Sequence, residues 1–151
     1  MLVYRVEKNK YRKVYPPEGS KFANGRWSTR DMWVVYTSES IALAKLETLA
    51  NTGSQIPRER FVRTLEVDNS APLVEVTIEQ LPTNWASVSY PKKLVKIVKD
   101  IMQEGEYVGA IVPSAQSPRE SNILLFPEHP NFNRFVQKVD DSAEDFDPRL
   151  K

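Results

Sequence analysis

Few side chains in this sequence can do covalent chemistry or bind metal ions. The 151 residues include no cysteine and one histidine, His129. The lack of cysteine excludes disulfides, thiolate zinc sites, iron–sulfur clusters and cysteine nucleophiles. A single histidine excludes sites with several histidine ligands, so no metal is expected. His129 stands between Glu128 and Pro130, which favours a turn residue over a catalytic base.

The glycines do not form a known nucleotide-binding motif. None of the five glycines belongs to the Gly-x-Gly-x-x-Gly pattern of a dinucleotide fold or to the Gly-x-x-x-x-Gly-Lys pattern of a P-loop. A dinucleotide, if one binds, must therefore be held in another way.

The carboxylate of Glu47 borders a predicted core. Residues 39–51 lack glycine and proline and are rich in helix formers, so they predict a helix that Ser38 caps. At about 100° per residue, Glu47 falls at the edge of one apolar stripe. The stripe consists of Ala42, Leu43, Leu46, Leu49 and Ala50. From the helix alone, a solvated or ion-paired glutamate is the commoner arrangement, because charged residues are seldom buried.

Two basic segments raise the alternative of nucleic-acid binding. Aromatic and basic residues interleave between Tyr4 and Tyr15, as they do in grooves for single strands. Lysines also line the outer face of a helix predicted from Pro91 to Gln103. However, 21 basic and 20 acidic residues leave a formal net charge of +1. Direct binding to nucleic acid or to a membrane is therefore not expected.

The hydrophobic pattern predicts one domain of mixed helices and strands. Strands are predicted at residues 2–6, 32–37, 60–67, 73–78, 107–112 and 121–126. A turn is predicted at 68–72, and residues 132–139 form a last strand or a short helix. An acidic tail at 140–151 is expected to be mobile, because it has little to bury. No secretory or membrane-spanning segment is recognisable, so the expected location is the cytoplasm.

Eight short motifs follow one another along the chain. They are Tyr4-Arg5-Val6, Gly25-Arg26-Trp27-Ser28, the run from Val34 to Ala44, Leu46-Glu47, Leu81-Pro82-x-Asn84-Trp85, Val112-Pro113-Ser114-Ala115, Glu120-x-Asn122 and Pro127-x-His129-Pro130. In this order they resemble the RES-domain proteins, the toxin halves of bacterial RES–Xre toxin–antitoxin modules. Arg26, Glu47 and Ser114 match the Arg, Glu and Ser that name the family. Two positions, Ser28 and Phe126, depart from it, since asparagine is common at both.

The resemblance implies an α/β (α+β) domain of the ADP-ribosyltransferase-like type, in which helices flank a mixed β-sheet. The RES domain would cover residues 1–139. The resemblance also implies that NAD is the substrate, that no prosthetic group is present, and that the bond between nicotinamide and ribose is cleaved. One carboxylate suits this chemistry, because nicotinamide leaves as a neutral molecule and needs no general acid.

Six residues are expected to carry the implied activity. Glu47 would stabilise the cationic transition state, and Tyr36 would position the nicotinamide end. Arg26 and Arg5 would hold the pyrophosphate or ribose, since guanidinium groups bind phosphate through paired, charge-assisted hydrogen bonds. Ser114 would support the pocket, and Ser114 and Asn122 would contact NAD.

Several alternatives remain open from the sequence. The acceptor of ADP-ribose is water, phosphate or a protein, and the last would make the chain a protein-modifying ADP-ribosyltransferase. The chain could also be a non-catalytic module that binds an antitoxin. Because RES toxins are typically neutralised by an Xre-like antitoxin that blocks the cleft, such a partner is expected, with assembly into an oligomer together with it.

Overall fold

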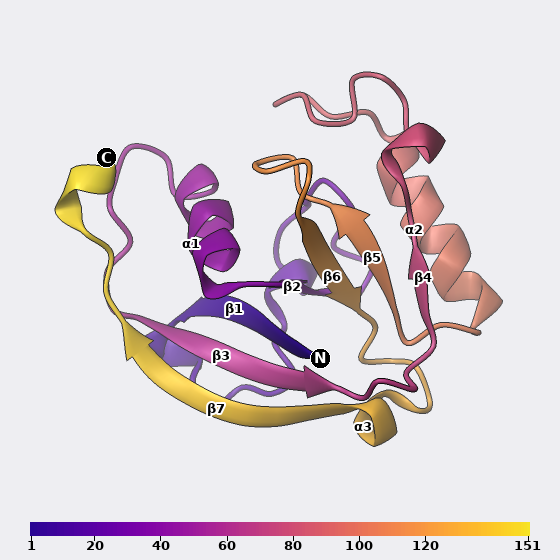
Figure 1. Cartoon of the computed structure of the whole chain (residues 1–151), viewed down its shortest axis with the longest axis horizontal. Coiled ribbons are helices and arrows are strands. Elements are labelled where there is room, and N and C mark those ends of the chain that lie inside the picture. The colour runs from indigo at the N-terminus through magenta and orange to yellow at the C-terminus, as the bar shows by residue number, and fades with distance from the viewer.

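The computed structural model describes all residues from 1 to 151 and contains one seven-stranded sheet (Figure 1). The strand order is β4-β5-β6-β2-β1-β3-β7, and every neighbouring pair is antiparallel except β4 and β5. The strands are β1 (Leu2–Lys8), β2 (Val35–Ser38), β3 (Arg60–Val67), β4 (Leu73–Glu75), β5 (Gly109–Pro113), β6 (Ser121–Leu125) and β7 (Val136–Glu144). The predicted mixed α/β domain is confirmed.

Two longer helices and several short ones accompany the sheet. The α-helices are α1 (Ile41–Ala50), α2 (Lys93–Glu104) and α3 (Phe132–Phe135), and single 3-10 turns occur at Asn9–Tyr11, Gly19–Lys21, Ile78–Gln80 and Pro148–Leu150. Residues 132–139, predicted to form either a strand or a short helix, contain both, since they begin as α3 and continue as β7. No helix is both long enough and apolar enough to cross a membrane.

Two hydrophobic clusters form the core on opposite faces of the sheet. One cluster joins Leu94 and Val98 of α2 to Ala110, Val112 and Leu124 of the sheet. Trp27 and Trp85 belong to the same cluster, with ring centroids 6.5 Å apart. The other cluster contains alternate residues of the same strands, among them Val35, Ile123 and Leu125. This division follows from the pleat, because successive side chains of a strand point to opposite faces.

The segment 68–72 is not a hairpin turn. The strand β3 pairs with β1 and β7, whereas β4 pairs with β5 at the far edge of the sheet. The predicted turn therefore carries the chain from β3, the neighbour of the edge strand β7, to β4 at the opposite edge of the sheet (Figure 1).

The buried face of α1 differs from the predicted stripe. Leu43 and Ala44 are buried, whereas Ala42 and Ala50 are exposed and Leu46 is 41% exposed. The prediction was wrong because the helix is rotated so that Glu47 faces the sheet, where it finds polar partners. The helix also begins later than predicted, since the Oγ atom of Ser40, rather than that of Ser38, accepts the capping hydrogen bond from Leu43 N (3.0 Å).

The expected mobile tail is also wrong for residues 140–144. These residues complete β7 and pair with β3 from Arg60 to Thr64. Lys45 Nζ lies 2.8 Å from Glu144 Oε1, and Phe146 is only 6% exposed. The acidic residues thus occupy an edge strand, where their backbone pairs with β3; Asp140 faces solvent, whereas the side chain of Asp141 is only 12% exposed.

Candidate functional site

One face of three neighbouring strands brings polar side chains together. Ser38 of β2 is registered with Asn122 of β6, and Asn122 is registered with Val112 of β5. By alternation, Tyr36 lies on the same face as Ser38, and Ser114, two residues beyond Val112, lies on the same face as Asn122. The helix α1 packs over β1 and β2 and places Glu47 against this group (Figure 1).

Glu47 is held by two donors on one of its oxygens. Its Oε1 accepts hydrogen bonds from Ser114 Oγ (2.6 Å) and from Asn122 Nδ2 (2.8 Å). Ser38 Oγ donates to Asn122 Oδ1 (2.8 Å), which fixes the amide so that its NH₂ group faces Glu47. Both of these hydrogen bonds go to Oε1 and none goes to the other oxygen, Oε2; the side chain is half-buried. The carboxylate is therefore fixed in direction with one oxygen left for a ligand.

Ser114 can act only as a donor to Glu47. Its Oγ already accepts from the backbone N–H groups of Gln116 (3.1 Å) and Ser117 (3.2 Å) in the turn that follows β5. The hydroxyl proton is thus directed at the carboxylate. Ser114 is fully buried, and charge-assisted hydrogen bonds of this kind are stronger than neutral ones.

Arg26 connects the Glu47 region to the segment before α2. Its Nη1 donates to the carbonyl oxygens of Trp85 (2.7 Å) and Ser87 (2.8 Å), and its guanidinium lies 4.7 Å from the ring centroid of Tyr90. Burial lowers the pKa of Arg26, while the negative charge of Glu47 acts against this shift. The guanidinium stays charged, and its hydrogen bonds within the protein come from Nη1, not from Nε or Nη2.

Tyr36 is fixed by its hydroxyl group. The hydroxyl lies 2.7 Å from Ser28 Oγ and 3.3 Å from Trp27 N, which donates to it. Burial raises the pKa of Tyr36, although the hydrogen bonds from Ser28 and Trp27 lower it in part. Ser28, where the resembling family commonly has asparagine, thus keeps a polar contact at this position.

We expect Tyr36 to resist ionisation in a titration to alkaline pH. Because the neutral phenol is favoured in the folded state, its contribution to stability is present below the ordinary tyrosine pKa of about 10 and is lost as the pH rises above it. The ultraviolet absorbance of tyrosinate should show late-titrating groups among the six tyrosines, with Tyr15 also raised by burial. Tyr36→Phe should remove one of the tyrosines that ionise at the higher pH values. Loss of a tyrosine that ionises near its ordinary pKa instead would contradict the raised pKa of Tyr36.

Gly25 leaves room for the Tyr36 hydroxyl. A Cβ atom at position 25 would lie 2.7 Å from Tyr36 Oη, closer than atoms can approach. We expect Gly25→Ala to displace the phenol from Ser28 and to lower the free energy of unfolding by about 1–3 kcal/mol, measured by denaturant titration. The double variant Gly25→Ala/Tyr36→Phe should lose less than the sum of the single variants. Additive losses would show that the two positions do not clash.

Arg5 is not brought together with Glu47. Its neighbour Tyr4 shares the face of Ser38, so Arg5 lies on the opposite face of β1 together with Glu7. Arg5 Nη1 donates to Tyr36 O (3.0 Å), and Arg5 Nε is 3.6 Å from Glu7 Oε1. Its role as a phosphate ligand stays a prediction.

Sequence reasoning missed two contributors. Ser38 was assigned to a helix cap, yet it orients Asn122, and its spacing of two from Tyr36 in a strand was the signal that could have revealed it. Tyr90, which stacks on Arg26, carried no such signal.

Phe126 is buried in the apolar cluster with α2 and makes no side-chain polar contact. His129 is a turn residue as predicted: its Nδ1 accepts from Asn131 N, so Nε2 donates to Gly105 O (2.9 Å).

Comparisons with known proteins agree on one family. A family profile described as RES domain matches residues 2–147. A protein named Toxin Res from Yersinia enterocolitica is 29% identical over 153 residues, covering 100% of both chains. Toxin Res from Photorhabdus laumondii is 28% identical over 99% of this chain and 97% of its own.

A third relative and a solved structure extend the comparison. A protein named Prs ADP-ribosylating toxin from Sphingobium is 32% identical over 116 residues, which cover 75% of this chain and 72% of that protein. The fold is similar to a chain in the crystal structure of the M. tuberculosis MbcT–MbcA toxin–antitoxin complex, with a TM-score of 0.71 and 17% identity over 99% of this chain and 85% of that one.

Proposed function

The chain belongs to the RES domain family, and from this membership and the Glu47 site we propose that it is a toxin that consumes NAD by cleaving the bond between nicotinamide and ribose. The membership confirms the family that the sequence motifs predicted. The proposal of NAD as substrate rests on the similarity to a relative named as an ADP-ribosylating toxin and on the chemistry of the site.

The observation that carries the proposal is the carboxylate of Glu47, fixed through Oε1 by Ser114 and Asn122 with Oε2 unpaired. When the bond breaks, its electron pair moves to the pyridinium nitrogen, and neutral nicotinamide leaves. Positive charge then develops on the ribose. A preorganised carboxylate stabilises that charge without needing a second group to protonate the leaving group.

The neighbouring side chains suit the rest of the substrate. The free Nε and Nη2 of Arg26 supply N–H donors for the pyrophosphate or a ribose hydroxyl. Tyr36, held by Ser28 and Trp27, offers a rigid aromatic group for the nicotinamide end. Water or phosphate completes the reaction by bonding to the anomeric carbon, with release of one proton when water is the acceptor.

An antitoxin is the expected protein partner. The structurally similar M. tuberculosis chain was solved in a toxin–antitoxin complex. We propose that an Xre-like antitoxin binds this chain as well and blocks access of NAD to Glu47. Co-expression with such a partner should restore growth to cells that express the toxin.

The experiment is to follow NAD and its products by chromatography after adding the purified chain, with and without phosphate. Free ADP-ribose would identify water as the acceptor, and its phosphorylated form would identify phosphate. Absence of NAD loss and of any labelled product in both buffers, even with cell lysate added, would overturn the proposal and favour a non-catalytic antitoxin-binding module.

Transfer of ADP-ribose to a protein is the second candidate, because the Sphingobium relative is named for ADP-ribosylation. The same site serves both reactions, and only the acceptor differs. Incubation of lysate with NAD labelled in its adenosine part separates them: label on a protein band supports transfer, whereas label only in small molecules supports NAD degradation.

A further inference from the structure

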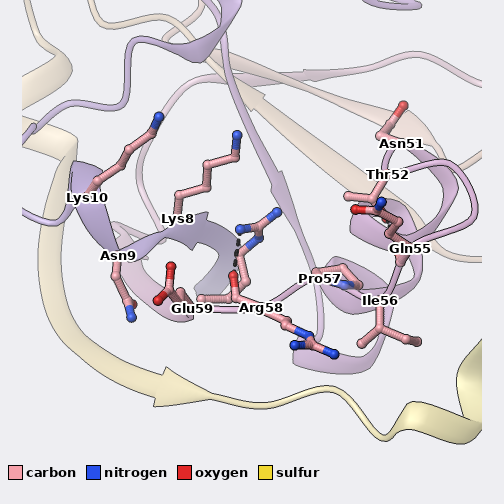
Figure 2. A pocket seen from close by; sticks show the side chains of 11 residues that line it. Lys8, Asn9, Lys10, Asn51, Thr52, Gln55, Ile56, Pro57, Arg58 and Glu59 are labelled. Carbon is pink, nitrogen blue, oxygen red and sulfur yellow. Dashed lines mark hydrogen bonds between the residues drawn. The ribbon is translucent and has the colours of Figure 1, made fainter.

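A wide cleft of the molecule lies away from Glu47. It has a volume of about 1070 Å³ and opens where β1 ends, where the segment after α1 returns, and where β3 begins (Figure 2). Neither Glu47 nor any other residue predicted for the NAD site lines it. The lining residues are Lys8, Asn9, Lys10, Asn51, Thr52, Gln55, Ile56, Pro57, Arg58, Glu59 and Arg60.

The charges in this cleft are unbalanced. Four cationic side chains line it, Lys8, Lys10, Arg58 and Arg60, against the single carboxylate of Glu59. None of these five groups forms an ion pair, and the only side-chain hydrogen bond among these residues runs from Arg60 Nη1 to the backbone oxygen of Arg58 (2.8 Å, the dashed line in Figure 2). In a chain of net charge +1, this is a local excess of positive charge in a concave surface, where the field is concentrated.

We propose that this basic cleft binds a small ligand that carries several linked phosphates. Guanidinium forks bind phosphate oxygens in pairs, and lysines add point charges. Figure 2 shows Lys8 and Lys10 on one side and Asn51 and Gln55 on the other. The amide groups can donate to further phosphate oxygens, and the volume is that of a small-molecule site.

The lining favours an oligophosphate over a nucleic-acid strand. No aromatic side chain lines the cleft, whereas proteins that bind single strands stack bases on aromatic rings. The cleft therefore offers recognition of charge without recognition of a base. The inference rests on residues separate from the proposed NAD site and holds whether or not that reaction occurs.

The test is calorimetric titration with inorganic tripolyphosphate, repeated with NAD present. The variant Lys8→Gln/Arg58→Gln removes two cations from two different segments that line the cleft. The control Lys92→Gln/Lys93→Gln removes the same charge from exposed lysines at the start of α2. We expect the cleft variant to bind at least about tenfold more weakly, because two charge-assisted bonds are lost, and the control to bind as the parent does.

Several results would overturn the proposal. These are no binding by the parent, equal weakening in both variants, or loss of binding when NAD is saturating or Glu47 is replaced by Gln. Tighter binding of a single-stranded oligonucleotide or an acidic peptide than of tripolyphosphate would also overturn it. If thermal unfolding shows that the first variant is not folded, the pair Lys10→Gln/Arg60→Gln provides the same comparison.

Discussion

Glu47→Gln is expected to reduce the rate of NAD consumption by about 10²–10³-fold, which is the typical effect of removing one preorganised electrostatic group. Glutamine keeps the size of the side chain, and its carbonyl oxygen can accept the same bonds from Ser114 and Asn122. Only the negative charge is lost. The measurement is the initial rate of nicotinamide release at saturating NAD, with thermal unfolding measured on the same sample.

The matched control is Glu79→Gln, which removes the same charge from an exposed residue in the 3-10 turn Ile78–Gln80. This variant should keep the parent rate. If Glu47→Gln kept full activity while folded, Glu47 would have no part in the reaction. If both variants lost activity equally, the effect would be one of net charge.

Arg63→Met is expected to lower the free energy of unfolding by about 3–5 kcal/mol, as is typical when one partner of a buried ion pair is removed. Arg63 is fully buried, with Nε 2.7 Å from Glu7 Oε2 and 3.6 Å from Asp141 Oδ1. Its Nη2 also donates to Arg12 O (3.0 Å). Methionine fills much of the volume but removes the buried cation between the two carboxylates, which leaves Glu7 with Arg5 alone and Asp141 with Lys138 alone.

The same variant should show a distinctive pH dependence. Burial raises the pKa of Glu7, and the charges of Arg5 and Arg63 hold it down in part. Without Arg63 the folded-state pKa of Glu7 rises further, so the folded variant is favoured at acid pH and loses stability as the pH rises. The difference between parent and variant should therefore narrow as the pH is lowered below neutral.

Denaturant titration at several pH values measures both effects. The control Arg30→Met removes an exposed arginine that forms no ion pair and should change the free energy of unfolding by less than about 0.5 kcal/mol. A loss in Arg63→Met no larger than in this control would show that the cluster of Arg63, Glu7 and Asp141 does not stabilise the fold.

The sequence alone determined the local features of this protein. The strand Arg60–Val67 was predicted with its observed bounds, because a segment rich in β-branched and other apolar residues between turn residues favours a strand locally. The end of α1 follows from Asn51 and Gly53, and the end of α2 follows from Gly105. Each of these residues lies within one helical turn of the end that it specifies. The motifs also identified the family and placed Glu47 and Ser114 among the candidates before any contact was known.

The tertiary structure alone decided which face each residue occupies. Glu47 faces the sheet because Ser114 and Asn122, which are 67 and 75 residues away in the chain, supply its donors. The acidic residues of β7 are ordered by backbone pairing with β3, and Arg63 is buried because Glu7 and Asp141 arrive from two other strands. Helix and strand periods fix the spacing of side chains along an element, but the rotation of a helix and the partner of a strand depend on contacts between distant segments.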